Sequence, residues 1–156
     1  MLNLQLMLYD EMLKQLKLGF RDGKAATSKP VYVLSIIESI NDNQLTENKI
    51  YFNNENIKTH YKEFSERYKG QITTPFLPFF IRPFYHLSSE PFYSLIWKDD
   101  TVPPPNSHTP SAKYLRENLE YAKLDDDLWE LLQDSENRAY LKQTLVKTYL
   151  NETTPS

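Results

Sequence analysis

The chain has 156 residues, a formal net charge of −3 and no cysteine, so disulfides, thiolate zinc sites and a cysteine nucleophile are excluded. Hydrophobic residues make up 40% and charged residues 25% of the sequence, which indicates one soluble globular domain. Proteins that bind nucleic acid through overall charge are usually basic, so a nucleic-acid site in this acidic chain would have to be a local basic patch.

We predict a single domain over residues 1–150 and a disordered tail over 151–156. No segment approaches the roughly 20 apolar residues that a membrane span requires. The amino-terminal apolar run lacks the basic region and the cleavage site of an export signal. We therefore expect a cytoplasmic protein that does not contact a membrane.

Helical spacing predicts the first element of the chain. Its apolar residues recur at intervals of three and four, which places them on one face of a helix. They are Leu2, Leu6, Tyr9, Leu13 and Leu16. Gly19 ends this helix, and in the loop 19–29 the basic residues Arg21, Lys24 and Lys29 outnumber the one acid. This loop is the most basic short segment of the sequence.

Two more helices and one short strand are predicted before the middle of the chain. Pro30 suits the first position of a helix, where its missing N–H would be unpaired in any residue. The segment 30–40 is apolar on nearly every side and indicates a buried helix. The segment 48–52 is a strand candidate, and one apolar stripe over 57–68 predicts the next helix, which Gly70 ends.

The second half of the chain predicts a hairpin, a proline-rich loop and helices. The aromatic segments 84–87 and 92–97 flank the turn SSEP, which is typical of a β-hairpin. Three consecutive prolines in 99–110 favour an extended linker. Helical patterns follow over 114–122 and 128–149. The expected fold class is α+β, mainly α: a helical domain with a small β-hairpin, winged-helix-like in layout.

No motif in the sequence predicts a catalytic, metal or cofactor site. None of the three histidines forms an HExxH pair, and the three glycines form neither a P-loop nor a GxGxxG motif. Asp42 with Glu47 and Lys49 imitates the acid and lysine pattern of a metal-dependent nuclease, but the spacing is very short. A polar turn before a strand is the simpler interpretation of those three residues.

Four sequence segments occur in an order that resembles a known family. They are YDEMLKQL, SKPVYVLSIIESI, PFYHLSSEPFYSL and AKLDDDLWELLQDSENRAYLKQTLVKTYL. Together, from about residue 9 to residue 150, they resemble the N-terminal domain of HNH restriction endonucleases of the McrA type. That domain is the sulfur-binding domain, which recognises phosphorothioate-modified DNA. The third and fourth segments are the most specific.

The resemblance implies a DNA-recognition module of bacterial defence without catalytic residues of its own. In the family, a shallow apolar pocket with a proline accepts the sulfur, and basic residues hold the DNA backbone. The matching proline is Pro83, preceded by Arg82, and His86 takes a position that is small in the family. Lys29, with Ser28 beside it, matches the family's basic residue. The expected DNA-binding residues are Arg21, Lys24, Ser28, Lys29, Arg82, Pro83, Tyr85 and His86.

An apolar pocket of this kind has a physical basis for selecting sulfur. Sulfur in place of a non-bridging oxygen is larger and less strongly hydrated. An apolar rim therefore penalises an ordinary phosphate oxygen, which loses hydrogen bonds to water. Nearby cations add a salt-dependent affinity that is common to modified and unmodified DNA.

Double-stranded DNA is thus the first expected partner. An HNH nuclease domain or subunit outside this chain is the second, and a second copy of the chain is a further candidate. Two other functions stay open on the sequence. A non-catalytic protein-interaction module on the same fold would show an exposed apolar patch and no basic face. A metal-dependent nuclease would need Asp42, Glu47 and Lys49 to converge around a cation.

Overall fold

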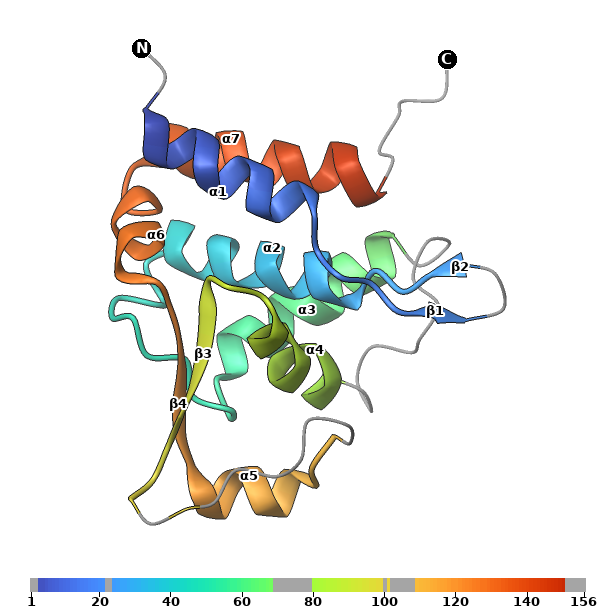
Figure 1. Ribbon diagram of the computed structural model, residues 1–156, viewed down its shortest axis with the longest axis vertical. Coiled ribbons are helices and arrows are strands. Elements are labelled where there is room, and N and C mark those ends of the chain that lie inside the picture. Colours follow the sequence, from blue (N-terminus) through green and yellow to red (C-terminus); the bar gives the residue numbers. More distant parts are fainter. Residues whose placement is uncertain (1–2, 22–23, 69–79, 100, 102–108, 151–156) are drawn as a thin grey trace.

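A computed structural model of the protein describes residues 3–21, 24–68, 80–99, 101 and 109–150. One central helix, α2 (Ser28–Asn41), organises the core. It packs against α3 (Glu55–Arg67), α4 (Ile81–His86) and α7 (Ser135–Leu145), which lie around it in Figure 1. The described residues share one hydrophobic core, and α2 runs through its middle.

Helix α2 is buried on nearly every side, as its sequence predicts. Its side chains from Val31 to Ile37 are all buried. The buried hydroxyl of Ser35 donates to the carbonyl of Val31, one turn back, at 2.8 Å, so it stays hydrogen-bonded inside the core. The helix begins at Ser28, two residues before Pro30, which places the proline within the first turn, where it is tolerated.

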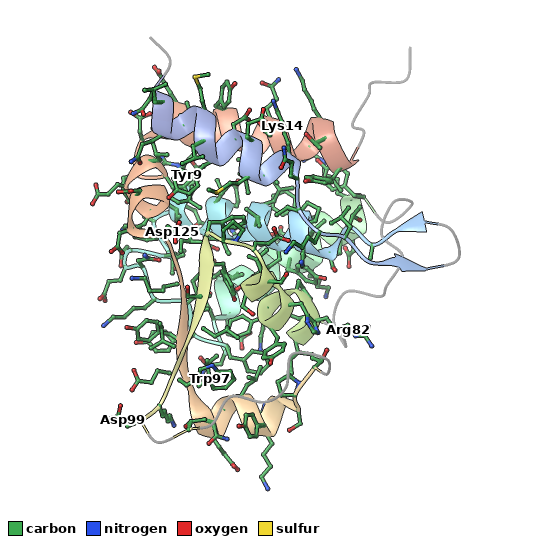
Figure 2. All side chains as sticks on the ribbon, viewed as in Figure 1. Tyr9, Lys14, Arg82, Trp97, Asp99 and Asp125 are labelled. Atoms are coloured by element: carbon green, nitrogen blue, oxygen red, sulfur yellow. The ribbon has the colours of Figure 1, made fainter. Side chains whose placement is uncertain are left out.

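Helix α1 (Leu4–Lys14) lies beside α7 and forms one outer layer of the molecule with it (Figure 1). The predicted stripe is confirmed for Leu6, Tyr9, Leu13 and Leu16, which are all buried, and its first member, Leu2, lies outside the described residues. The Tyr9 hydroxyl donates to Asp125 at 3.1 Å, a pair that Figure 2 labels. Burial, and then the Asp125 carboxylate, raise the pKa of Tyr9 to about 12, so the phenol stays protonated and keeps this bond.

Contacts before and after α7 hold it against α1. The segment that precedes α7 contains α6 (Asp126–Leu131), which contacts α1. Asp134 caps α7 by accepting from two backbone N–H groups of its first turn. The helix continues into a π-helical turn, Val146–Leu150. From that turn, the Tyr149 hydroxyl bonds to the backbone of Leu13 and Leu16 at the end of α1.

An aromatic cluster joins α2, α3 and α4. The Tyr32 ring of α2 meets the rings of Phe80 and Phe84 with centroids 5.6 and 6.1 Å apart. Tyr61 of α3 contacts Phe80 edge-on at 5.3 Å, and Phe52 contacts Phe84 at 5.1 Å. Edge-to-face pairs of this kind add to the stabilisation that burial gives. The cluster therefore holds α4 firmly against the central helix.

The prediction of a β-hairpin formed by 84–87 and 92–97 is wrong. The first of these segments is helical, because it completes α4 and the 3-10 turn Leu87–Ser89. The second becomes β3 (Tyr93–Trp97), which pairs antiparallel with the distant β4 (Leu119–Leu124).

Two other predicted elements also differ from the structure. The predicted helix over 114–122 is α5 (Ala112–Asn118) followed by the strand β4. The predicted strand 48–52 contributes one bridge, Ile50 to Ala122.

A second small ribbon lies within the predicted basic loop. Strands β1 (Phe20–Arg21) and β2 (Lys24–Ala25) form an antiparallel pair, and Figure 1 shows them projecting away from the helical body. The fold class is confirmed as mainly α with small antiparallel β elements. The winged-helix likeness and the disordered tail 151–156 stay predictions; the tail, like prolines 103–105 of the linker, lies outside the described residues. Within those residues, no helix has the length and apolar content needed to cross a bilayer.

Candidate functional site

A pocket of about 280 Å³ opens where the end of α1, the beginning of α2 and helix α4 meet. Its described lining consists of Lys17, Leu18, Gly19, Ala26, Ser28, Lys29, Arg82, Pro83, His86 and Ser89. Five of the eight residues that the sequence predicts for DNA binding line this one pocket: Ser28, Lys29, Arg82, Pro83 and His86. The fold thus brings together two segments that lie more than fifty residues apart in the sequence.

Helix α4 supplies one wall of the pocket. Pro83 stands in the first turn of this helix, where a missing N–H does not break the helical hydrogen bonds. Its side chain is buried but lines the pocket. Arg82 and His86 are four residues apart and therefore share one face of the helix. Arg82 is exposed, and Figure 2 shows its side chain projecting outward from α4.

The first turn of α2 supplies another part of the wall. Ser28 and Lys29 are the first two residues of this helix, and both line the pocket. N–H groups in the first turn of a helix have no partner within the helix, and the helix dipole places partial positive charge there. No acidic residue occupies this first turn. The pocket is therefore electropositive from the backbone as well as from its side chains.

A buried ion pair stands behind the pocket. The Lys29 ammonium lies 3.0 Å from the Glu90 carboxylate, and the two side chains are 12% and 3% exposed. The same ammonium donates to Ser89 at 2.9 Å, and Glu90 also accepts from the backbone N–H of Lys17 at 2.8 Å. Glu90 thus ties together the end of α1, the beginning of α2 and the turn after α4. It also neutralises part of the pocket's positive charge.

His86 contributes a neutral ring to the wall. Its Nε2 atom lies 2.7 Å from the Thr109 hydroxyl, and its ring meets the Tyr85 ring edge-on at 5.1 Å. Burial lowers the pKa of His86 below 6.5, and the positive charges of Lys29 and Arg82 lower it further. The imidazole is therefore uncharged at neutral pH. Burial is the main cause of this shift, and the two cations add to it.

The other three predicted residues lie around the pocket rather than in its described lining. Tyr85 is buried behind His86, and burial, helped by Tyr114, raises the pKa of its phenol. Arg21 and Lys24 face each other across the β1–β2 ribbon; their side chains lie outside the described part of the structure.

The base of that ribbon is part of the pocket wall. The Ala26 N–H donates to the Gly19 carbonyl at 2.7 Å, and both residues line the pocket. The ribbon that carries the two basic positions therefore starts at the rim of the pocket.

The sequence did not indicate three residues that shape this site. Lys17 lies just after the first predicted helix, and Ser89 and Glu90 lie in the turn SSEP. The only signal in the sequence was that each of these residues lies near a segment that was predicted to bind DNA. Glu90 in particular reads as an ordinary turn acid, and only the fold shows that its carboxylate is buried against Lys29.

The alternative of a nuclease site around Asp42 finds no support in the described contacts of Asp42 and Lys49. Burial raises the pKa of Asp42, but hydrogen bonds from His60 at 2.7 Å and Asn56 at 3.4 Å outweigh it and lower the pKa overall. Lys49 lies over the Tyr121 ring instead, 5.4 Å from its centroid. Across the part of the chain that the structure describes, no group of three or more acidic or histidine side chains is placed to hold a metal ion.

Comparison with solved structures identifies the class of fold as that of a sulfur-binding domain. One similar structure is the sulfur-binding domain of ScoMcrA complexed with phosphorothioated DNA. It matches with a TM-score of 0.70 at 16% sequence identity, over 95% of this chain and 90% of that chain.

A second similar structure contains the sulfur-binding domain and the SRA domain of ScoMcrA, also complexed with phosphorothioated DNA. It matches with a TM-score of 0.72 at 15% identity, over 94% of this chain and 44% of that longer chain. The resemblance predicted from the sequence is thereby confirmed at the level of the fold. No protein-family model and no curated protein sequence matches the chain.

Proposed function

We propose that this protein is a non-catalytic recognition domain that binds double-stranded DNA carrying a backbone phosphorothioate. The observation that carries the proposal is the pocket itself. Pro83 forms part of its wall, the neutral ring of His86 lies beside it, and the cations Lys17, Lys29 and Arg82 surround them. A site of this composition combines an apolar contact with a positive field, which suits an anion whose charge is spread over a large, soft atom.

Solvation explains how such a site selects sulfur over oxygen. A phosphate oxygen that enters the pocket gives up hydrogen bonds to water, and the Pro83 ring offers none in return. Sulfur is less strongly hydrated, so its transfer to the same position costs less. The neutral imidazole of His86 adds a flat surface of low polarity next to the proline. Selectivity therefore comes from the penalty against oxygen rather than from a new attraction to sulfur.

The positive side chains supply affinity and position the backbone. Arg82 and the first turn of α2 face the bound phosphorus group from two sides of the pocket. The ribbon with Arg21 and Lys24 starts at the pocket rim, where it can reach a neighbouring phosphate. Because Glu90 already neutralises Lys29, the pocket holds ordinary phosphate less strongly than three unpaired cations would.

The proposed role in the cell rests on the resemblance of the sequence to McrA-type endonucleases. We place this domain in a restriction endonuclease of bacterial defence, in the cytoplasm, where an HNH nuclease domain or subunit would cut DNA that the domain has located. The solved ScoMcrA chain that joins a sulfur-binding domain to an SRA domain supports such a modular arrangement. Adding an HNH subunit to the bound complex and measuring cleavage tests this part separately from binding.

Fluorescence anisotropy with matched duplexes tests the binding proposal. The duplexes share one sequence and differ only in a single sulfur atom. The two phosphorus diastereomers are tested separately, because each points the sulfur in a different direction. We expect one diastereomer to bind at least about tenfold more tightly than the unmodified duplex, equivalent to about 1.4 kcal/mol. Equal binding of all duplexes would reduce the function to general DNA binding, and no binding at low salt would reject it.

A protein-interaction module is the second candidate function, and one observation favours it. Leu4 and Leu8 expose 81% and 51% of their surfaces on α1, on the layer formed with α7 and away from the pocket lining. The sequence predicts such an exposed apolar patch for a module that binds protein. The same hypothesis predicts no basic face, whereas Lys17, Lys29 and Arg82 line the pocket, so the exposed leucines and the pocket call for separate explanations.

A further inference from the structure

One hydrogen bond connects the pocket to the end of the proline-rich linker 99–110. The Nε2 atom of His86 lies 2.7 Å from the hydroxyl of Thr109, which is 23 residues away along the chain and outside the described pocket lining. Both residues are half-buried, so water competes less for this bond than it would on an open surface. The bond therefore joins a residue of the site to one that has no other assigned part in it.

The sequence around Thr109 holds its hydroxyl in place. Thr109 precedes Pro110, and the residue before a proline is restricted to extended conformations. Ser111 then caps α5 by accepting from the backbone N–H of Tyr114 at 3.1 Å. Because the backbone of Thr109 is restricted by the proline and by the helix that follows, little conformational freedom is lost when its hydroxyl bonds to His86.

The beginning of α5 is also tied to the neighbours of His86. The Tyr114 ring meets the Trp97 ring of β3 with centroids 6.1 Å apart. Burial raises the pKa of Tyr85, and the Tyr114 phenol raises it further. Tyr85 in turn meets the His86 ring edge-on at 5.1 Å. The imidazole thus has one neighbour at its Nε2 atom and another against its ring, and both connect to the beginning of α5.

The hydrogen bond determines how the imidazole borders the pocket. The torsion angle between Cβ and the ring of a histidine is broad, so helix α4 alone does not fix the ring. A bond at Nε2 selects one orientation, because a ring turned by half a revolution presents a carbon atom to the hydroxyl instead. His86 then keeps one defined surface in the lining that it shares with Pro83.

We propose that Thr109 is a positioning residue for sulfur selectivity, whose hydroxyl holds the His86 ring in the orientation that borders the bound phosphorothioate. This inference rests on the proposed function, in which His86 and Pro83 supply the surface that penalises oxygen. Loss of the hydroxyl should therefore weaken the preference for sulfur. It should leave the salt-dependent affinity unchanged, because the cations of the pocket supply that affinity.

Three variants separate the hydroxyl from the rest of the side chain. Thr109→Val removes the hydroxyl at nearly constant shape, and Thr109→Ser keeps it. Thr101→Val is the matched control, at a half-buried threonine near the other end of the same linker. In fluorescence anisotropy, we expect Thr109→Val to lower the ratio of modified to unmodified binding by about threefold or more, through weaker binding of the modified duplex. Thr109→Ser and Thr101→Val should both keep the wild-type ratio.

A double-mutant cycle tests whether Thr109 acts through His86. His86→Phe keeps a flat ring but has no nitrogen to bond the hydroxyl, so Thr109→Val should have no further effect on the ratio in this background. Two measurements without DNA follow the contact itself. The nitrogen resonances of the His86 ring should shift in Thr109→Val and return in Thr109→Ser, and urea unfolding should show coupling between the substitutions at the two positions.

The outcomes separate this inference from the proposed function. A wild-type chain without sulfur preference would reject the proposed function, and coupling seen only in the measurements without DNA would then assign the contact to the fold alone. A preference that Thr109→Val leaves unchanged would overturn the positioning role and leave the proposed function intact. An effect that persists in the His86→Phe background would also overturn it, because the hydroxyl would then act on something other than the ring.

Discussion

The ammonium of Lys29, a residue of the pocket lining, lies 3.0 Å from the carboxylate of Glu90, which is buried. Lys29 belongs to the first turn of α2, and Glu90 belongs to the turn after α4. The pair therefore joins α2 to the turn after α4, next to the pocket lining. It also gives the pocket an internal anion, with which any bound phosphate has to compete for the Lys29 ammonium.

Replacing Glu90 by glutamine should lower stability and strengthen binding of ordinary DNA. The amide keeps an acceptor for the Lys17 N–H but loses the charged hydrogen bond to Lys29, a loss of about 2 kcal/mol. Urea unfolding measures the first effect, and anisotropy with unmodified duplex measures the second. Glu117→Gln is the control, because its pair with Lys113 at 3.9 Å is exposed and contributes little. Unchanged unfolding of the Glu90 variant would show that the buried pair is not structural.

Replacing Arg82 by alanine should weaken binding of modified and unmodified duplexes by similar factors. An arginine that contacts phosphate supplies salt-dependent affinity, so the slope of log K against log salt should fall by about one. Arg116→Ala is the matched control, because Arg116 is an exposed arginine on α5, away from the pocket lining. Loss of the preference for sulfur at constant salt dependence would instead assign Arg82 to the selective contact.

Side chains introduced at Gly19 should fill the pocket without disturbing the fold. A Cβ atom at this position meets no heavy atom within 4 Å, and Gly19 lines the pocket. Along the series Gly19→Ala, Gly19→Val and Gly19→Leu, we expect similar melting temperatures and progressively weaker binding of the modified duplex. Thermal unfolding and anisotropy provide the two measurements. Constant affinity along the series would mean that DNA does not enter this pocket.

The pKa of His86 gives the site a defined response to pH. Because this pKa is lowered in the folded protein, the unfolded chain binds the proton more readily, and stability falls as the pH drops below about 6.5. A bound anion has the opposite effect on His86, because negative charge favours the imidazolium. We therefore expect duplex binding to raise the pKa of His86 and to tighten as the pH falls through the same range.

Nuclear magnetic resonance of the histidine rings measures this pKa with and without duplex. His86→Gln identifies the resonance among the three histidines and should remove the pH dependence of binding. A pKa of His86 that does not change on adding duplex would place the bound phosphorus group away from this ring.

Removing one buried hydroxyl should loosen the α4 wall from the core. The Tyr93 hydroxyl donates to the Phe84 carbonyl at 2.6 Å and lies 3.0 Å from the Tyr32 hydroxyl. In Tyr93→Phe both groups lose a partner inside the core, which costs about 1–3 kcal/mol. Denaturant unfolding measures the loss, and Tyr51→Phe, at an exposed tyrosine, is the control. An equal effect of the two variants would contradict a structural role of this bond.

Local pattern was sufficient to predict the helices with one apolar stripe. The spacing of Leu6, Tyr9 and Leu13 predicts α1, and Ile57 and Tyr61 predict α3, because each helix buries one face against a common core. The buried helix at Pro30 was predicted from its opening proline and from apolar residues on nearly every side, with a beginning two residues too late. These predictions depend only on neighbours three or four residues apart.

Predictions failed where distant contacts decide the conformation. Leu115, Leu119 and Ala122 have helical spacing, yet Ala122 lies in a strand, because its N–H and carbonyl bond to Ile50 at 2.8 and 2.7 Å. Phe84 was predicted in a strand, but the α4 helix lets it reach Tyr32 in the core. No sequence pattern near either residue contains this information.

The pocket was predictable only in part for the same reason. The resemblance supplied Pro83, Arg82 and Lys29 as members of one site, and the fold places them in one lining. Glu90, which bonds to Lys29 and to the Lys17 backbone, was missed because a buried turn acid looks the same as an exposed one in a sequence. Which charged residues pair with each other depends on how the whole chain packs, so the local sequence does not reveal it.

The burial of α2 on nearly every side restricts how this protein could acquire a different ligand. Substitutions from Val31 to Ile37 would disturb the core, so this wall can vary only near Ser28 and Lys29. Helix α4 is also anchored by its buried residues, so on that wall only Arg82, which is exposed, and His86, which is half-buried, are less constrained, together with Gly19. Diversification of ligand choice among proteins with this fold is therefore expected to concentrate in these α4 positions and in the α1–α2 connection, while the central helix stays nearly invariant.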